Sequence, residues 1–366
     1  MPIFPSAPVR VQPYFGHRSP NRLSLSARAL KSGNPRFEAN GRMQAMRTML
    51  AQFASREAAG VDVTLEIAQP DGTIHHHSGT SDKEGFVHFD IALEGAWPLP
   101  AQTSWETATL RWTNDRGNQT TSGHVLVPGS EVDLGIISDI DDTIIETGIT
   151  GGIRSVLRNW RRVLQQMPEQ RVAVPGADKF YNAIGGGSTA LADGTATGQQ
   201  VPATKRPFFY VSSSPWNLYS YLVSYKRSRG VPLGPIHLRD WGLNEETFGS
   251  SSHGSHKVDA IRAILNEHAQ LRFVLIGDDS QGDLVAFGDI AQEFGERVAA
   301  IFIRRVGEDL SSEEEAAKAA ITGRNITLWM GDSFAIEQDF LEAAGLGYDD
   351  AAQKIVELTQ EGASSG

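Results

Sequence analysis

Two aspartates lie one residue apart where an apolar segment of the chain ends. Residues 134–138 lead into the pattern D-x-D-x-T, which contains Asp139, Asp141 and Thr143. An apolar run of this length that ends in turn residues is typical of a buried strand. Ligands of open parallel sheets bind at the carboxyl ends of the strands, and buried carboxylates are costly unless a cation or another partner compensates them. The pattern therefore predicts a divalent cation and a substrate that reacts with one of the two carboxylates.

Three later segments also place polar side chains at or near the ends of predicted elements. Ser212 and Ser213 follow the apolar residues 208–211, and Lys257 opens a helical pattern. A group of acids follows the apolar residues 272–276: Asp278, Asp279 and Asp283. Because the four segments follow one another on predicted elements of an α/β pattern, we interpret them as parts of one site.

This set of side chains suits phosphoryl transfer. A carboxylate can attack phosphorus and form an aspartyl-phosphate, and a second carboxyl group can protonate the leaving alkoxide and then activate water. A hydroxyl group and a lysine ammonium can hold the phosphoryl oxygens and offset their charge. Mg²⁺ prefers oxygen ligands in near-octahedral geometry. The residues therefore predict phosphoryl transfer through an aspartate with Mg²⁺ as the metal ion.

The four segments resemble the motifs of the haloacid dehalogenase-like phosphohydrolase superfamily. The resemblance implies that Asp139 is the nucleophile and Asp141 the general acid/base, and that Ser212 and Lys257 bind the phosphoryl group. It implies Mg²⁺ as the cofactor, held by Asp139, Asp141 and Asp278. Four further polar residues are expected beside the site as supporting groups: Thr143, Ser213, Asp279 and Asp283.

A narrower resemblance joins the chain to the phosphatidate phosphatase family named for the yeast actin-patch protein. It rests on Tyr210–Trp216, on His256 and Lys257, and on 276–278, together with the N-terminal residues 12–16 and 25–30. The family places a β domain before the catalytic domain, and its substrate class is phosphatidate or a related lipid phosphomonoester.

The resemblance leaves the metal ligands partly open. This chain has Asp279 where the family more often has a small hydroxyl residue. Which of Asp278, Asp279 and Asp283 binds the metal directly is therefore not decided by the sequence.

The elements that must position these residues differ between the two parts of the chain. Early segments alternate apolar and polar residues with turn signals between them, as expected of a small β-sandwich: 22–30, 61–67, 86–91, 107–112 and 123–127. A helix is expected over 42–56. Later segments alternate apolar strands with helical patterns, as expected of a covered parallel sheet: strands 134–138, 208–211, 272–276, 298–303 and 326–329, and helices 153–167, 217–226, 257–266 and 284–294.

We therefore expect a smaller, mostly-β, sandwich-like domain over residues 1–130. It precedes a Rossmann-like α/β domain with a parallel sheet, of the haloacid dehalogenase type, over 131–360. Residues 185–205 are rich in small residues and are expected to form a mobile loop.

Composition excludes several classes of function. The 366 residues include no cysteine, which rules out disulfides, zinc thiolates and a cysteine nucleophile. The net charge of −11 argues against nucleic-acid binding, which needs a basic surface. The N-terminus lacks the pattern of a signal peptide, and no apolar stretch is long enough to cross a bilayer. We expect a cytoplasmic enzyme.

The expected helix over 153–167 has two interpretations. Its apolar stripe favours ordinary packing on the core, but its cluster of arginines could attract an anionic headgroup and bring the enzyme into peripheral contact with a membrane. The arginines are Arg154, Arg158, Arg161 and Arg162. Two other functions stay open: a phosphatase for a soluble phosphomonoester, and a membrane- or partner-binding module in which catalysis is secondary.

Overall fold

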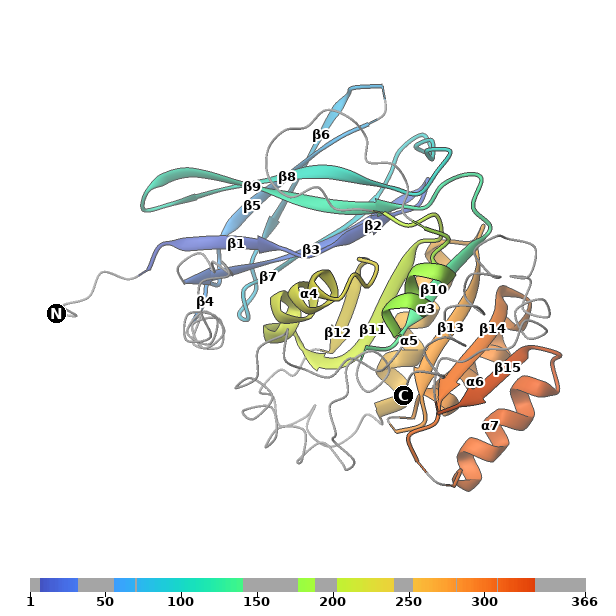
Figure 1. Cartoon of the computed structure of the whole chain (residues 1–366). Helices are drawn as coiled ribbons and strands as arrows, with labels where there is room; N and C mark the ends of the chain where they lie inside the picture. The colour runs from blue at the N-terminus through green and yellow to red at the C-terminus, as the bar shows by residue number, and fades with distance from the viewer. Residues whose placement is uncertain are drawn as a thin grey trace. The chain divides into compact units, whose positions relative to one another are not determined.

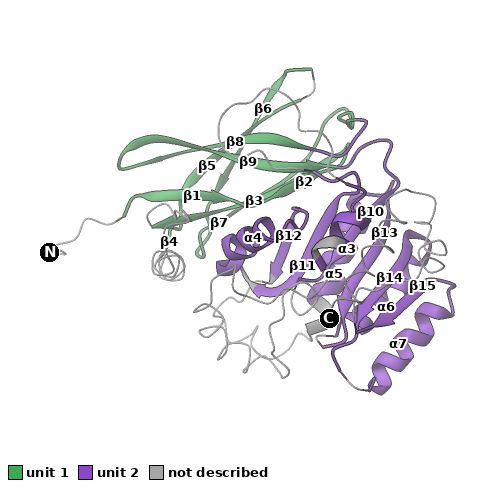
Figure 2. Cartoon of the chain, in the orientation of Figure 1, with its two compact units in different colours: residues 1–100, 105–127, 164–167 green, residues 101–104, 128–163, 168–366 purple. Residues whose placement is uncertain are grey.

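A computed structural model of the chain describes residues 7–31, 56–69, 71–140, 177–187, 203–239, 253–280, 282–307 and 309–332. The described residues divide into two compact units (Figure 2). The first contains residues up to 100 together with 105–127, and the second contains 101–104 and the residues from 128 onward. Three predicted segments lie outside the described residues entirely or for most of their length: the helices over 42–56 and 153–167, and the loop over 185–205.

The first unit is mostly β, as predicted. Its strands are β1 (Val9–Pro13), β2 (Gly16–Arg18), β3 (Arg22–Lys31), β4 (Arg56–Glu57), β5 (Asp62–Ala68), β6 (Ile74–Thr80), β7 (Phe86–Ala92), β8 (Ser104–Asn114) and β9 (Gly117–Val127). They form one nine-stranded hydrogen-bonded network that branches at β3. β3 pairs antiparallel with β1, β2, β4 and β7, whereas β2 and β9 run parallel.

Alternation along the strands builds the core of this unit. Successive side chains of a strand point to opposite faces, so Leu23 and Leu25 of β3 are buried together with Val63 and Leu65 of β5. These side chains belong to one apolar cluster, which also contains Trp97. The packing of two separate sheets in a sandwich stays a prediction.

The second unit alternates strands and helices. Its strands are β10 (Leu134–Ser138), β11 (Phe208–Pro215), β12 (Ile236–Arg239), β13 (Arg272–Asp278), β14 (Val298–Arg304) and β15 (Thr327–Gly331). Its helices are α3 (Ala177–Ile184), α4 (Tyr219–Ser228), α5 (His253–Glu267), α6 (Asp283–Phe294) and α7 (Ser312–Thr322). Short 3₁₀ turns, Trp216–Leu218 and Gly295–Arg297, precede α4 and β14.

The six strands form one parallel sheet in the order β12-β11-β10-β13-β14-β15 (Figure 1). After β10 the chain adds β11 and then β12 on one side of β10, and it then places β13 on the opposite side of β10. This is the strand order of a doubly wound sheet, in which the loops after the two central strands diverge and leave a crevice at the carboxyl edge. The parallel sheet is confirmed, and its switch point lies between β10 and β13.

Layers of helices explain why the central strands are continuous apolar runs. Every residue of β10 is buried, and so are all but the first residue of β13. A parallel sheet that is covered on both faces requires this pattern. Contacts join α5 to α6 and α6 to α7 in one layer, while Figure 1 shows α3 and α4 over the other face of the sheet.

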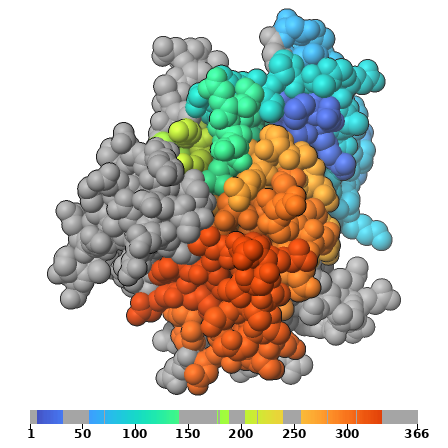
Figure 3. Space-filling view, turned by 90° about the vertical axis from the view of Figure 1, so that its right-hand side faces the viewer, coloured from blue at the N-terminus to red at the C-terminus, as the bar shows by residue number. Residues whose placement is uncertain are grey.

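The edge of the sheet is more open than its centre. All five residues of β15 are half-buried, and the red atoms of α7 and β15 occupy a broad part of the face shown in Figure 3. In the described part of the chain, no helix is long and apolar enough to cross a membrane.

Candidate active site

Asp139 directly follows β10 at the switch point of the sheet. Its backbone amide donates a 2.8 Å hydrogen bond to the carbonyl of Ile276 in β13, which carries the ladder of hydrogen bonds one residue past the strand. The residue is only 3% exposed. The two central strands thus hold the Asp139 backbone at the carboxyl edge, where the sequence pattern predicted a reactive carboxylate.

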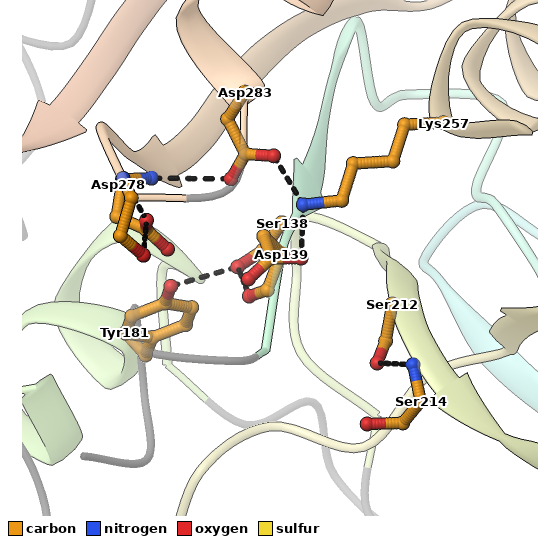
Figure 4. Close-up of polar contacts among 9 residues, drawn as sticks. Ser138, Asp139, Tyr181, Ser212, Ser214, Lys257, Asp278 and Asp283 are labelled. Atoms are coloured by element: carbon orange, nitrogen blue, oxygen red, sulfur yellow. Dashed lines mark hydrogen bonds and ion pairs between the residues drawn. The ribbon is translucent and has the colours of Figure 1, made fainter. Parts of the chain in front are cut away.

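Four of the predicted site residues form one buried group, which we term the acid–lysine cluster: Asp139, Lys257, Asp278 and Asp283. Lys257 projects from the beginning of α5, and its Nζ lies 2.8 Å from Asp139 Oδ1. The same ammonium forms an ion pair with Asp283 Oδ1 (Figure 4). Asp283 Oδ2 accepts a 3.1 Å hydrogen bond from the backbone amide of Asp278. Residues from the ends of two strands and from two helices therefore meet at one point.

The cluster has the donor set of a divalent-cation site. Carboxylate oxygens of Asp139, Asp278 and Asp283 all lie within 4.8 Å of one another, and all three residues are buried. Hard oxygen donors of this kind suit Mg²⁺. Both oxygens of Asp283 already accept hydrogen bonds, from Lys257 and from the Asp278 amide. Of the described residues, these three acids could hold a metal ion, and the two contacts of Asp283 fix the direction of its carboxylate.

The charges of the cluster shift the pKa values of its members. Burial raises the pKa of Asp278 to about 7, and the like charge of Asp283 adds to the rise, while Lys257 and the Ser280 hydrogen bonds lower it. Burial by itself lowers the pKa of Lys257, but the charges of Asp139, Asp283 and Asp278 together outweigh burial and hold that pKa above its usual value. Lys257 therefore stays cationic, whereas Asp278 exchanges a proton near neutral pH.

A glycine allows Asp283 to approach the end of β13. A Cβ atom at Gly277 would lie 2.5 Å from Asp283 Oδ2 and 2.8 Å from its Cβ. Real Cβ atoms do not come so close to their neighbours, so any larger residue at 277 would displace Asp283 from the amide that it binds. The absence of a side chain at Gly277 is thus what lets Asp283 take its place in the cluster.

Asp279 does not join the cluster. Its Oδ2 accepts a 2.7 Å bond from Arg305 Nε, and its Oδ1 accepts from the amides of Val306 and Gly307 at 2.6 and 3.1 Å. Of the three late acids, the structure therefore brings Asp278 and Asp283 to Asp139 and directs Asp279 toward the loop after β14.

The structure places Ser212 apart from the acids. It is fully buried in β11, and its Oγ accepts a 3.0 Å hydrogen bond from the amide of Ser214 (Figure 4). Ser213 between them is half-buried. The roles of Ser212 and Ser213 stay predictions, and Asp141 and Thr143 lie outside the described residues.

Sequence reasoning missed a buried hydroxyl pair behind Asp139. Ser138 Oγ donates to the carbonyl of Asp139 at 2.6 Å and lies 2.7 Å from the hydroxyl of Tyr181 in α3. Because the single Ser138 proton goes to the carbonyl, Tyr181 must be the donor in the second bond. The serine could have been noticed beside Asp139, but no local signal connects Tyr181 with it.

A family model matches the segment of the chain that contains this site. Residues 134–305 match the family model described as "Phosphatidate phosphatase APP1, catalytic domain". Phosphatidate phosphatase APP1 of Saccharomyces cerevisiae is 32% identical over 178 residues, which cover 49% of this chain and 27% of that protein. An uncharacterized protein of Schizosaccharomyces pombe is 26% identical over 178 residues, with 48% and 26% covered.

These relatives are much longer proteins. The matched part of the chain spans about a quarter of the length of the two curated relatives. Among solved structures, a β-glucuronidase of Parabacteroides merdae aligns with a TM-score of 0.24 and 10% identity, covering 82% of this chain and 34% of that one. A likeness this weak carries no argument. The family model and the yeast relative confirm the resemblance that the motifs predicted, and they show that this chain is close to the phosphatidate phosphatase APP1 family through its catalytic domain.

Proposed function

We propose that the chain is a magnesium-dependent phosphoric monoester hydrolase that acts on phosphatidate or a related lipid phosphomonoester. The observation that carries the proposal is the acid–lysine cluster at the switch point, where Lys257 Nζ lies 2.8 Å from Asp139 Oδ1 within the segment that matches the catalytic-domain family. The substrate class is the one for which that family is named. The strand order supports a haloacid dehalogenase-type, Rossmann-like domain.

The reaction consists of two displacements at phosphorus. A carboxylate oxygen of Asp139 attacks phosphorus, the bond from phosphorus to the ester oxygen breaks, and Asp141 gives its proton to the leaving alkoxide. Asp141 then takes a proton from a water molecule, which attacks the aspartyl-phosphate, releases inorganic phosphate and restores the Asp139 carboxylate. Lys257 remains charged throughout and faces Asp139, so it can offset charge on the phosphoryl oxygens.

Asp139 and Asp278 would hold the Mg²⁺ ion, with Asp141 as a further ligand and Asp283 as support. When bound, the ion neutralises charge on the transferring phosphoryl group. Ser212 is proposed to bind the phosphoryl group as well, since it lies on β11, the strand beside β10.

We also propose a cytoplasmic enzyme with peripheral membrane contact through the arginines of 153–167. Replacing Arg154, Arg158, Arg161 and Arg162 with Gln should weaken sedimentation with anionic vesicles and turnover of lipid substrate, because each basic residue contributes on the order of 1 kcal/mol near such a surface. Hydrolysis of a small soluble phosphomonoester should be spared.

A substrate panel tests the proposal. Phosphate release is measured with phosphatidate in mixed micelles, with lysophosphatidate and with water-soluble phosphomonoesters, each with and without Mg²⁺. Turnover of phosphatidate that needs Mg²⁺ and disappears in Asp139→Asn is expected. Asp133→Asn is the matched control, because it makes the same change at an exposed position just before the other end of β10. Turnover of the soluble esters alone would replace the lipid assignment, and turnover of none would overturn the enzyme assignment.

A further inference from the structure

One carboxylate ties the loop after β13 to the loop after β14. Three donors from a single segment converge on Asp279: Arg305 Nε and the backbone amides of Val306 and Gly307. The Asp279 side chain is 4% exposed, although Arg305 keeps 28% of its side chain accessible. A carboxylate that is occupied at both oxygens in this way is held in one orientation.

Backbone hydrogen bonds also hold the loops after β13 and β14. The amide of Asp279 donates to the carbonyl of Arg304 at 3.1 Å, and the amide of Arg305 donates to the carbonyl of Gly331 at 2.6 Å. The ladder of the sheet therefore continues past the ends of β13 and β14 into the two loops. The hydrogen bond from Arg305 to Gly331 therefore holds the loop after β14 in place where it contacts Asp279.

Asp278 directly precedes Asp279 in the chain. Its amide is bound by Asp283 Oδ2, and its Oδ1 accepts a 2.6 Å hydrogen bond from the Ser280 amide. The residue on the other side, Asp279, is the one held by Arg305 and its two neighbours. The direction of the Asp278 carboxylate is thus set by fixed contacts on both sides of its Cα atom.

We propose that Asp279 and Arg305 form a positioning pair that orients Asp278 toward the cation of the active site. This inference rests on the proposed function, since it assigns Asp278 as a metal ligand. The pair holds the backbone that presents Asp278, and the guanidinium offsets the charge of the Asp279 carboxylate, which lies outside the cluster. Partners that orient metal ligands typically contribute about 10–100-fold to metal affinity.

The positioning role makes a prediction that a merely structural brace does not. Loss of a contact that only stabilises the fold would lower the melting temperature and leave the metal affinity of the folded protein unchanged. Loss of a positioning pair weakens metal binding in the folded protein, and it leaves turnover nearly normal once the metal is saturating, because neither residue belongs to the acid–lysine cluster. The pair also acts as a unit, so loss of either partner should have most of the effect of losing both.

The test measures Mn²⁺ binding to the full chain from the loss of the free-ion electron paramagnetic resonance signal. Asp279→Ala and Arg305→Ala are each expected to raise the Kd about tenfold or more, and the double variant little further. Asp279→Asn keeps an oxygen for the two backbone amides but loses the ion pair, and it provides a milder variant if the alanine variant folds poorly. Arg305→Lys restores the charge and should recover part of the affinity.

The matched control is Arg262→Ala, which removes an exposed arginine that is paired with Glu293 and Asp259 on the helical layer of the same unit. Its Kd for Mn²⁺ should equal that of the wild type. An unchanged Kd in folded Asp279→Asn and Arg305→Ala, with normal binding by the wild type, would overturn the positioning role and leave the proposed function standing. No Mn²⁺ binding by the wild-type chain would overturn both.

Discussion

Mg²⁺ binding to this chain should weaken steeply as the pH falls below about 7. In the acid–lysine cluster, burial and the neighbouring Asp283 raise the pKa of Asp278 to about 7. A carboxyl group must be deprotonated before it binds a metal ion. Below that pH, each ion that binds has to displace a proton from Asp278, and the displacement opposes binding.

The size of the effect follows from the pKa. Each pH unit below it costs about 1.4 kcal/mol, or a factor of about ten in Kd. With a pKa of about 7, the Kd at pH 6 should be about tenfold larger than at pH 8, and a plot of log Kd against pH should flatten above pH 7.

The raised pKa of Asp278 also determines whether the stability of the metal-free protein rises or falls with pH. In the folded chain the Asp278 carboxyl keeps its proton up to a pH of about 7, whereas in the unfolded chain it releases the proton near its ordinary pKa of 3.8. Folding is therefore favoured by this group at low pH, and the free energy of unfolding falls as the pH rises from about 4 to about 7. Above about pH 7 the contribution of this group to the free energy of unfolding has been lost completely. Mg²⁺ should increase the stability most strongly at these pH values.

Titration calorimetry in buffers with different ionisation enthalpies measures both the Kd and the protons released. About 0.9 proton per Mg²⁺ is expected at pH 6 and almost none at pH 8.5. Asp278→Asn should bind the ion weakly and without this proton release, whereas Asp133→Asn, at an exposed position, should behave as the wild type. A Kd that stays constant between pH 6 and pH 8, with no proton released, would refute the reasoning.

Three further substitutions test other parts of the second unit. Asp139→Asn should abolish turnover in a folded protein, since loss of a covalent nucleophile raises the barrier by several times the ~1.4 kcal/mol that corresponds to each tenfold in rate; near-normal phosphate release would exclude the mechanism. Gly277→Ala should displace Asp283, lower stability by about 1–3 kcal/mol and weaken Mg²⁺ binding, as measured by thermal unfolding and calorimetry; unchanged values would show that the site can yield. Lys226 is fully buried in α4, with its Nζ 3.4 Å from the ring centroid of Tyr210 and no hydrogen-bond partner in the part of the chain that the structure describes. Burial lowers its pKa well below 10.5, so the folded state binds fewer protons, and stability should rise with pH up to about 10.5. Lys226→Met should remove this rise and add about 1–3 kcal/mol of stability by eliminating a buried unsatisfied donor; chemical denaturation at several pH values checks both effects.

The sequence predicted the centre of the site because chain pattern and sheet geometry coincide there. An apolar run that ends in D-x-D-x-T has few alternatives to a buried strand with polar residues at its end, and β10 has the predicted bounds, Leu134–Ser138. Lys257 and Asp278 were found by the same reasoning at the ends of other elements. Asp278 meets Asp139 because parallel pairing brings the carboxyl ends of β10 and β13 to one edge of the sheet, and Lys257 reaches them from the beginning of α5.

The sequence did not decide between the three late acids, because the decision depends on distant residues. Asp278 ends β13 and Asp279 begins the turn that follows it, so the local sequence pattern does not say which of the two faces the site. The loop after β14 supplies the answer through Arg305, which no motif marks. Asp283 returns to the cluster because Gly282 has a φ of +80°, a conformation that suits glycine and turns the chain into α6.

Elements without a strong local pattern were missed for physical reasons. β12 has only four residues, too few for a period to be recognised. α3 has eight, and its hydrogen bond from Tyr181 to Ser138 joins segments that are far apart in the chain. α7 is an exception, because it was missed although Ser311 and Glu314 form a capping box at its beginning.

The strand order also has a consequence for the way this protein folds. β10 is made early, but one of its two neighbours, β13, follows only after β11 and β12 have been added to the chain. Until β13 pairs with it, β10 presents an open, apolar edge of the kind that promotes association between chains. Pairing across such a sequence separation is intrinsically slow. Asp139 and Asp278 meet only when that pairing is complete. The rate at which cation binding appears during refolding should therefore report the rate at which β13 pairs with β10. A truncated chain that ends before β13 should neither bind the ion nor stay monomeric.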